Sequence, residues 1–246
     1  MKIFAIIPCR YESTRFEGKP LALISGRPMI QHVYENVALS EKVDQVVVAT
    51  DDLRILETVR RFNGRAVLTA VDNRSGTDRV AEAAEILGLS LDDIVVNVQG
   101  DQPMIKPIAI DTVAAPLVED PTLEMSTLAC AITDSREYTD PKDCKVVVDH
   151  NGYALYFSRA PIPFVRDPGD RYEALKHLGI YAYRRSFLEI FRHLPLGKCE
   201  QIEKLEQLRA LEFGHRIKIV VSEHDSPEVD LPEDIQRIEQ FLKTEG

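Results

Sequence analysis

The chain has 246 residues, of which 44% are hydrophobic and 28% are charged, as expected for a globular protein with a full core. Its formal net charge of −10 argues against a general nucleic-acid-binding surface. The 4 cysteines are widely spaced and form no CxxC pair, so neither a disulfide framework nor a zinc site is expected.

The start of the chain does not resemble a targeting segment. Met1 and Lys2 lead directly into a short apolar run, residues 3–7, which ends at Pro8. No apolar stretch reaches the length of a membrane span. We therefore expect a cytoplasmic protein with no membrane partner.

The first hundred or so residues alternate between strand and helix patterns. Helices are expected to begin at Pro28, to place Leu53, Leu56 and Val59 on one face, and to run through an alanine-rich segment to Leu87. The buried strands between and around these helices are predicted at residues 3–7, 46–49, 66–69 and 94–98. This order predicts an α/β fold with a Rossmann-like, mostly parallel sheet.

The pattern is less regular in the second half. An Asn151-Gly152 turn predicts a β-hairpin between residues 145–148 and 154–157. The other predicted strands lie at 125–132, 177–183 and 216–221, and helices are predicted at 108–118, 202–213 and 232–243. No Gly-rich or Pro-rich linker divides the chain. We expect one domain over residues 1–246, with a small β-rich subregion at about 130–185.

The polar segment after the first strand holds Arg10, Arg15 and Lys19 among small and hydroxyl residues. Such a loop is suited to a polyanion, because backbone N–H groups approach a phosphate where side chains are small and the cations neutralise it. The alternative is a solvated basic loop. The segment IPCRYESTRFEGKP resembles IPARxxSxRxPGKP, the opening loop of the 3-deoxy-manno-octulosonate (KDO) cytidylyltransferases, with Cys9 at a usual Ala and Glu17 at a usual Pro.

A second motif, NRSGTDR at residues 73–79, precedes a predicted helix. A Gly-containing turn at a helix N-terminus can hold a base or a phosphate through backbone groups. The alternative is a simple capping loop with Thr77 or Asp78 as the N-cap. The string resembles the SGTDR motif that contacts cytosine in the same family, which implies nucleotide binding by Arg74, Ser75 and Gly76.

Two aspartates are candidates for a divalent cation site. Asp101 follows a predicted strand in VNVQGDQP, which resembles the family's VNVQGDEP with Gln102 at a usual Glu. Asp230 lies in EVDLPED, which resembles GVDTPEDL with Glu228 at a usual Gly and Leu231 at a usual Thr. A turn or helix-capping role is the alternative for each. The resemblance, rather than the spacing, implies that the two converge on Mg²⁺.

Three further strings match the family in order: ALYFSRAPIPF, KHLGIYAYRR and EKLEQLRALEFG. An arginine in an apolar run needs an acidic or polar partner, either a protein carboxylate or a sugar acid. From the residues alone, the simpler interpretations are that His177 is a core histidine and that Tyr181 is a packing aromatic. The resemblance implies a sugar-acid pocket lined by Arg159, His177, Tyr181, Glu206 and Gln207.

The resemblance runs from Ile3 to Asp234 and implies a nucleotide-diphospho-sugar transferase type of fold with the β-rich subregion as a homodimer interface. It implies transfer of CMP from CTP to KDO, with pyrophosphate released, for lipopolysaccharide biosynthesis. Some details, including GDQP and SPEVD, are similar to a subgroup that uses 8-amino-3,8-dideoxy-manno-octulosonate. Arg10, Lys19 and Asp101 would be catalytic, Asp101 and Asp230 would hold Mg²⁺, and the nucleotide would contact Arg10, Ser13, Arg15, Lys19, Arg74, Ser75, Gly76 and Gln99.

Two other classes of protein remain as alternatives. A dinucleotide-binding oxidoreductase needs GxGxxG after the first strand, whereas the segment from Cys9 to Lys19 contains only Gly18. A non-catalytic nucleotide-binding protein would explain the Glu17 and Gln102 departures, although Lys19 and both aspartates are present.

Overall fold

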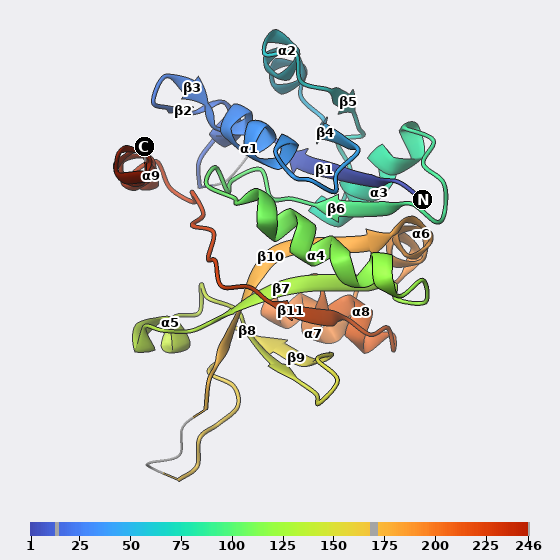
Figure 1. Ribbon diagram of the computed structural model, residues 1–246, viewed down its shortest axis with the longest axis vertical. Coiled ribbons are helices and arrows are strands. Elements are labelled where there is room, and N and C mark those ends of the chain that lie inside the picture. Colours follow the sequence, from blue (N-terminus) through green and yellow to red (C-terminus); the bar gives the residue numbers. More distant parts are fainter. Residues whose placement is uncertain (13–14, 168–171, 246) are drawn as a thin grey trace.

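The computed structural model describes residues 1–12, 15–167 and 172–245 (Figure 1). Within these ranges nine strands form one mixed sheet in the order β11-β7-β10-β6-β1-β4-β5, with β8 beside β10 and β9 beside β8. The strands are β1 (Ile3–Cys9), β4 (Gln45–Thr50), β5 (Ala66–Leu68), β6 (Ile94–Asn97), β7 (Met125–Ala131), β8 (Lys145–Val148), β9 (Ala154–Ser158), β10 (Leu175–Arg184) and β11 (Lys218–Val221). This sheet confirms the predicted α/β fold class.

Helices cover both faces of the sheet (Figure 1). One face packs against α1 (Met29–Ala38), α2 (Leu53–Arg61) and α4 (Pro107–Glu119). The other face packs against α3 (Gly76–Ile86), α6 (Arg185–His193) and α8 (Leu208–Glu212). The remaining short elements are a 3₁₀ turn (Lys19–Leu21), β2 (Leu23–Ile24), β3 (Arg27–Pro28), α5 (Ser135–Thr139), α7 (Lys198–Glu203) and α9 (Asp234–Glu245).

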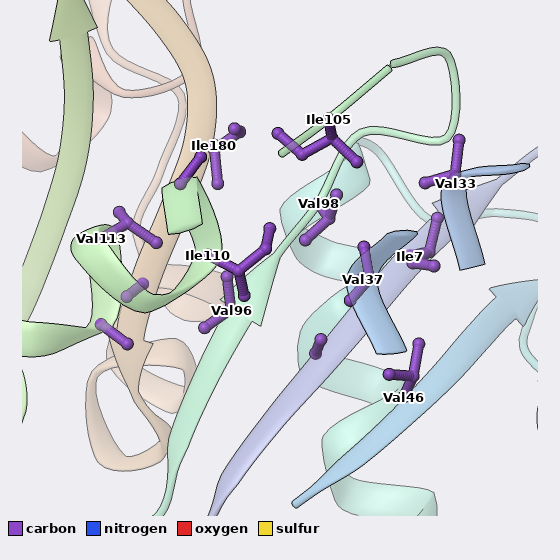
Figure 2. Close-up of a cluster of buried hydrophobic side chains, with 14 of the residues drawn as sticks. Ile7, Val33, Val37, Val46, Val96, Val98, Ile105, Ile110, Val113 and Ile180 are labelled. Atoms are coloured by element: carbon purple, nitrogen blue, oxygen red, sulfur yellow. The ribbon is translucent and has the colours of Figure 1, made fainter. Parts of the chain in front are cut away.

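The central strands are apolar along their whole length because both of their faces are buried. Ile7 and Val96 point into the α1/α4 layer, where they meet Val37 and Ile110 (Figure 2). Ile6, one residue earlier in β1, points into the opposite layer. The continuous apolar run at residues 3–7 therefore contributes side chains to the hydrophobic cores on both faces of the sheet.

The order in which successive strands are added to the sheet changes direction at β1. β4 pairs with one side of β1 and β6 with the other, and both pairings are parallel. The carboxyl ends of the three strands therefore lie at the same edge. Open α/β sheets bind ligands in the crevice at such a switch point, so the loops after β1 and β6 are placed to form a site.

The C-terminal segment returns to this edge. After β11 it runs across the molecule to α9, which lies near the β2–β3 hairpin (Figure 1). Val229 and Ile238 form a small buried cluster there with Ile24 and Met29. This packing brings residues 228–230 beside the loop after β6, where the backbone N–H of Val229 donates to the carbonyl of Asp101 at 2.9 Å.

One predicted helix is wrong. Residues 202–213 do not form a continuous helix, because α7 ends at Glu203 and Lys204 adopts a left-handed conformation with φ of 55°. The Glu203 carboxylate accepts from Ser158 and from the Arg159 backbone, which fixes the chain at this break. Gly214 ends α8 with a positive φ, as expected.

The other differences concern boundaries and missed elements. The last helix starts at Asp234 rather than at Pro232, and the sequence did not predict α5, α6, the β2–β3 hairpin or the 3₁₀ turn. The predicted hairpin is confirmed as β8 and β9, which pair antiparallel. In the described part of the chain, no helix has both the length and the apolar character to cross a membrane.

Candidate active site

A solvent-open hollow of about 490 Å³ lies at the carboxyl ends of β1 and β6. The loop after β1 and the loop after β6 form its walls, which confirms that these two predicted segments meet. Its lining residues are Pro8, Cys9, Arg10, Glu12, Lys19, Pro20, Gln99, Gly100 and Asp101.

Lys19 connects the three segments of the chain that meet at this hollow. Its ammonium lies 2.6 Å from Asp101 Oδ2 and 3.7 Å from Asp230 Oδ1, and it donates to the Val229 carbonyl at 2.9 Å. Arg15 Nη1 donates to the other oxygen of Asp230 at 2.9 Å. The two aspartates, far apart in sequence, are therefore adjacent in space and share one partly buried cation.

Two glycines allow the loops to approach this closely. Gly18 has a φ of 70°, which disfavours other residues, and its N–H donates to Tyr11 to close the first loop. A Cβ at Gly100 would lie 2.7 Å from Cys9 Sγ and 3.2 Å from the Pro8 carbonyl. The Cys9 thiol is buried, and this burial raises its pKa, so it stays protonated and serves as a small packing group.

The cations of the first loop are not all oriented alike. Arg10 lines the hollow and donates to the backbone carbonyl of Asn73, which ties the first loop to the second motif. Arg15 is largely exposed and turned toward Asp230. Ser13, another predicted nucleotide contact, lies outside the described residues.

The second motif begins a helix, as predicted, but its cap differs. Ser75, rather than Thr77 or Asp78, is the N-cap of α3, and its hydroxyl accepts from the Asp78 backbone N–H at 3.1 Å. Gly76 is the first residue of α3, and a Cβ there would lie 3.7 Å from the Pro8 side chain. This contact places the start of α3 beside the end of β1.

Neither arginine of the second motif lines the hollow at β1. Arg74 binds Asp78 at 3.0 Å and the Arg192 carbonyl at 2.7 Å, and lines a separate hollow of about 620 Å³. Arg79 is fully buried and pairs with Asp51 at 2.6 Å. Arg79 therefore holds α3 to the end of β4 and is not free to bind a ligand.

Four of the predicted sugar-acid residues are arranged along β10 and the break before α8. His177 and Tyr181 lie on β10 with ring centroids 5.3 Å apart. Burial lowers the pKa of His177 to about 3, so this imidazole is neutral near pH 7. Glu206 contacts the Thr77 hydroxyl, and burial raises its pKa. Gln207 is buried beside Cys144.

Arg159 has no carboxylate salt bridge within the described ranges. Its guanidinium donates to the carbonyls of Glu203 and Pro141, both at 2.8 Å. Backbone carbonyls satisfy the donors without cancelling the charge. No protein carboxylate pairs with the Arg159 guanidinium within the described residues, so a sugar-acid carboxylate as its partner stays a prediction.

The Asp101/Asp230 pair has the chemistry of a magnesium site. Mg²⁺ prefers oxygen ligands and often takes only one or two protein carboxylates, with water and phosphate oxygens completing its coordination. Lys19 already places a positive charge between the two carboxylates. No cluster of three or more His, Cys, Asp or Glu side chains suited to a metal occurs among the described residues, so other oxygen ligands would have to come from substrates and water.

One contact at this site was not predicted from the sequence. Gln102 Nε2 donates to Glu228 Oε1 at 3.1 Å. Although Glu228 is exposed as a residue, its carboxyl group packs against protein atoms, and this burial together with Asp101 and Asp230 raises its pKa to about 7. Both residues were visible as departures from the motif strings, but nothing local in the sequence indicates that they touch.

Comparison with known proteins gives consistent results. A family model described as cytidylyltransferase matches residues 4–218. A 3-deoxy-manno-octulosonate cytidylyltransferase from Desulfosudis oleivorans is 62% identical, covering 98% of each chain. An 8-amino-3,8-dideoxy-manno-octulosonate cytidylyltransferase from Shewanella amazonensis is 54% identical over the whole of both chains. A solved CMP:2-keto-3-deoxy-manno-octonic acid synthetase complexed with CTP is 42% identical, with a TM-score of 0.94 and full coverage of both chains.

Proposed function

Because the chain belongs to the cytidylyltransferase family and is a nucleotidyltransferase, we propose that it joins CMP from CTP to a 3-deoxy-octulosonate sugar acid and releases pyrophosphate. The observation that carries this proposal is the junction of Lys19, Asp101 and Asp230 at the switch point of the sheet. It gathers a phosphate-binding cation and two carboxylates at one point.

Lys19, Arg10 and Arg15 would hold the triphosphate and the leaving pyrophosphate. The sugar's anomeric oxygen attacks the α-phosphorus and its proton passes to solvent water, while the bond from the α-phosphorus to the bridging oxygen breaks and its electron pair leaves with pyrophosphate. Such transfers depend on positioning and charge neutralisation more than on a covalent protein group. We propose no dedicated general base.

Mg²⁺ held by Asp101 and Asp230 would neutralise phosphate charge and lower the pKa of the attacking hydroxyl. Without a ligand, the positive charge of Lys19 partly neutralises the two carboxylates. With CTP bound, the same ammonium would contact a phosphate placed beside Asp101 and Asp230. The carboxylates therefore orient both the lysine and the cation.

The sugar acid would bind on the β10 side of the site. Arg159 donates to the carbonyls of Glu203 and Pro141, and Nε2 of the neutral His177 ring is hydrogen-bonded to the Thr127 hydroxyl at 2.9 Å. Glu206 is within reach of the second motif through Thr77. This arrangement supports a substrate that carries a carboxylate and several hydroxyls.

We propose KDO as the substrate, with its 8-amino analogue as the alternative, because relatives of both names match over nearly the whole chain. The test is turnover of purified protein with CTP, Mg²⁺ and each sugar, with the CMP-sugar product identified by mass. A higher kcat/KM for KDO supports the proposal. A higher value for the amino sugar assigns the chain to the other activity, and no CMP-sugar from either refutes both.

The base pocket is expected to prefer CTP. The base would be held by the backbone around Ser75 and Gly76, at the start of α3 and beside Pro8. We expect CTP to bind more tightly than UTP and purine triphosphates to be rejected by size. Competition between nucleotides in a binding assay checks this, and ATP competing as well as CTP would show that this segment does not hold the base.

We propose that the protein is a homodimer through the β-rich subregion. Two large apolar side chains of this subregion are exposed, Leu155 on β9 at 62% and Phe164 in the segment after β9 at 86%. Apolar groups so exposed are typical of an interaction surface. Light scattering of the purified protein checks the mass, and Phe164→Asp should shift it toward the monomer.

A further inference from the structure

Two buried lysines lie directly opposite each other in the sheet, away from the hollow at β1. Lys176 of β10 pairs with Lys145 of β8 in the antiparallel ladder, and the two residues are 7% and 0% exposed. Like charges directly opposite on neighbouring strands destabilise a sheet, and a buried ammonium needs partners. The arrangement is costly unless each ammonium is well bound, so the partners indicate what the pair does.

Both lysines hold the loop that follows α5. Lys145 Nζ donates to two backbone carbonyls of residues 140–143, and Lys176 Nζ lies 3.8 Å from the Asp143 carboxylate. Another carbonyl of this loop accepts from the Arg159 guanidinium at 2.8 Å. The conformation of the loop therefore helps to fix the position of Arg159.

Lys176 also joins two segments that are far apart in the sequence. Its ammonium lies 2.9 Å from Glu137 on α5 and 2.8 Å from Asp225 in the segment between β11 and α9. Burial by itself would lower the pKa of this ammonium, but its hydrogen bonds to Asp225 and Glu137 raise the pKa, so the group stays charged. One buried charge thus connects α5 with the C-terminal segment.

The C-terminal segment depends on such contacts because residues 222–233 belong to no helix or strand. Among the described residues, Asp225 is the first of this segment whose side chain bonds to another element. Farther along, the Val229 N–H donates to the Asp101 carbonyl at 2.9 Å, and Asp230 follows directly. The contact at Asp225 therefore helps to fix the path of the chain to Asp230.

We propose that Lys176 is a positioning residue that couples the two halves of the proposed site. Through Asp225 it fixes the segment that carries Asp230. Through Glu137 it fixes α5 and the loop that binds Arg159. This inference rests on the proposed function, and Lys176 itself touches no substrate. Loss of one carboxylate partner should disturb one half of the site, and loss of the lysine should disturb both.

Asp225→Asn and Glu137→Gln test this proposal, because each removes one partner of the same ammonium and keeps the size. CTP binding is measured by calorimetry across a Mg²⁺ titration without sugar, and KM for the sugar acid is measured at saturating CTP and Mg²⁺. Asp225→Asn should raise the half-saturating Mg²⁺ concentration about 3- to 10-fold, a usual size for coupling through packed and ion-paired residues, and leave the sugar KM within about twofold. Glu137→Gln should instead raise the sugar KM about 3- to 10-fold and leave the Mg²⁺ requirement within about twofold.

Hydrogen exchange in the metal-free protein gives a readout that needs no ligand. Asp225→Asn should speed backbone exchange in residues 222–233, because local opening becomes easier, whereas Glu137→Gln should speed it in residues 135–143. Glu223→Gln is the matched control, because it makes the same kind of charge change at an exposed position of the same segment, and it should do neither. The Mg²⁺ effect of Asp225→Asn should persist at about 0.5 M salt, where effects of charge through space are screened.

Lys176→Met should shift both the Mg²⁺ requirement and the sugar KM. It leaves three carboxylates, Glu137, Asp143 and Asp225, without their shared cation. A Tm for each variant reports folding. If Lys176→Met does not fold, the comparison of the two carboxylate variants still decides.

The proposal and the function on which it rests fail in different ways. A Mg²⁺ requirement in Asp225→Asn that matches Glu223→Gln would overturn the role of Lys176. So would Glu137→Gln raising the Mg²⁺ requirement as much as Asp225→Asn does. If the parent protein does not bind CTP with Mg²⁺ at all, the proposed function fails, and hydrogen exchange then decides whether Lys176 fixes the segment.

Discussion

Lys19→Ala should lower turnover by about 10²–10³-fold, the usual loss when one preorganised charge contact to the reacting group is removed. In the structure Lys19 contacts Asp101, Asp230 and the Val229 carbonyl at once. No other described lysine side chain lines the hollow. The measurement is steady-state kcat and kcat/KM with CTP, the sugar acid and saturating Mg²⁺.

The control is Lys106→Ala, which removes an exposed lysine at the N-cap of α4, outside the lining of the hollow, and should leave turnover unchanged. A circular dichroism spectrum and a Tm report whether the Lys19 variant is folded. Its Tm should fall modestly without metal, because two carboxylates lose their shared cation, and Mg²⁺ should recover part of the loss. Near-normal turnover in the folded variant would remove Lys19 from the site.

Asp101→Asn and Asp230→Asn should each lower turnover by roughly 10²–10³-fold, because a bound divalent cation supplies several kcal/mol of charge stabilisation. Each change keeps size and hydrogen bonding but removes one charge. Since the two carboxylates share Lys19 and are proposed to share one ion, the double variant should lose little more than the worse single variant. The measurement is kcat/KM for all four proteins over a Mg²⁺ titration.

Asp92→Asn, an exposed aspartate at the other end of β6, provides the control for a charge change alone. Chelation by EDTA should abolish turnover of the parent protein, and Mg²⁺ should restore it. Losses that multiply independently in the double variant would contradict a shared ion. Full activity in EDTA would contradict a metal requirement altogether.

The fold class was predictable because the central strands are buried on both faces. An apolar run such as residues 3–7 has few other uses, and Ile6 and Ile7 do enter opposite cores. The tight turn at Asn151-Gly152 is also specified by adjacent residues, and it correctly predicted the β8–β9 hairpin. Features set by neighbours in sequence were thus accessible from the sequence.

The prediction of one helix at 202–213 was wrong because the break in it is caused by residues distant in sequence. Leu205, Leu208 and Leu211 keep a helical spacing across the break. The helix is interrupted where Glu203 contacts Ser158 and Arg159, which are about 45 residues away in sequence. Glu206 and Gln207 therefore lie at the junction before α8 rather than within one long helix.

The site was predictable in part. That a cationic loop follows β1 and carries residues of the hollow could be argued from Arg10, Arg15 and Lys19. The meeting of Asp101 with Asp230 depends on the path of the C-terminal segment to α9, which no local pattern specifies. The Gln102–Glu228 contact was out of reach for the same reason.

The activity proposed for this site is transfer of CMP from CTP to an octulosonate sugar acid. Its most direct test is pyrophosphate release by the purified protein when CTP, KDO or its 8-amino analogue, and Mg²⁺ are mixed, with each component omitted in turn. The account predicts one pyrophosphate for each CMP-sugar formed and none when any component is missing. Pyrophosphate released without a sugar acid, or none released with all components present, would contradict it.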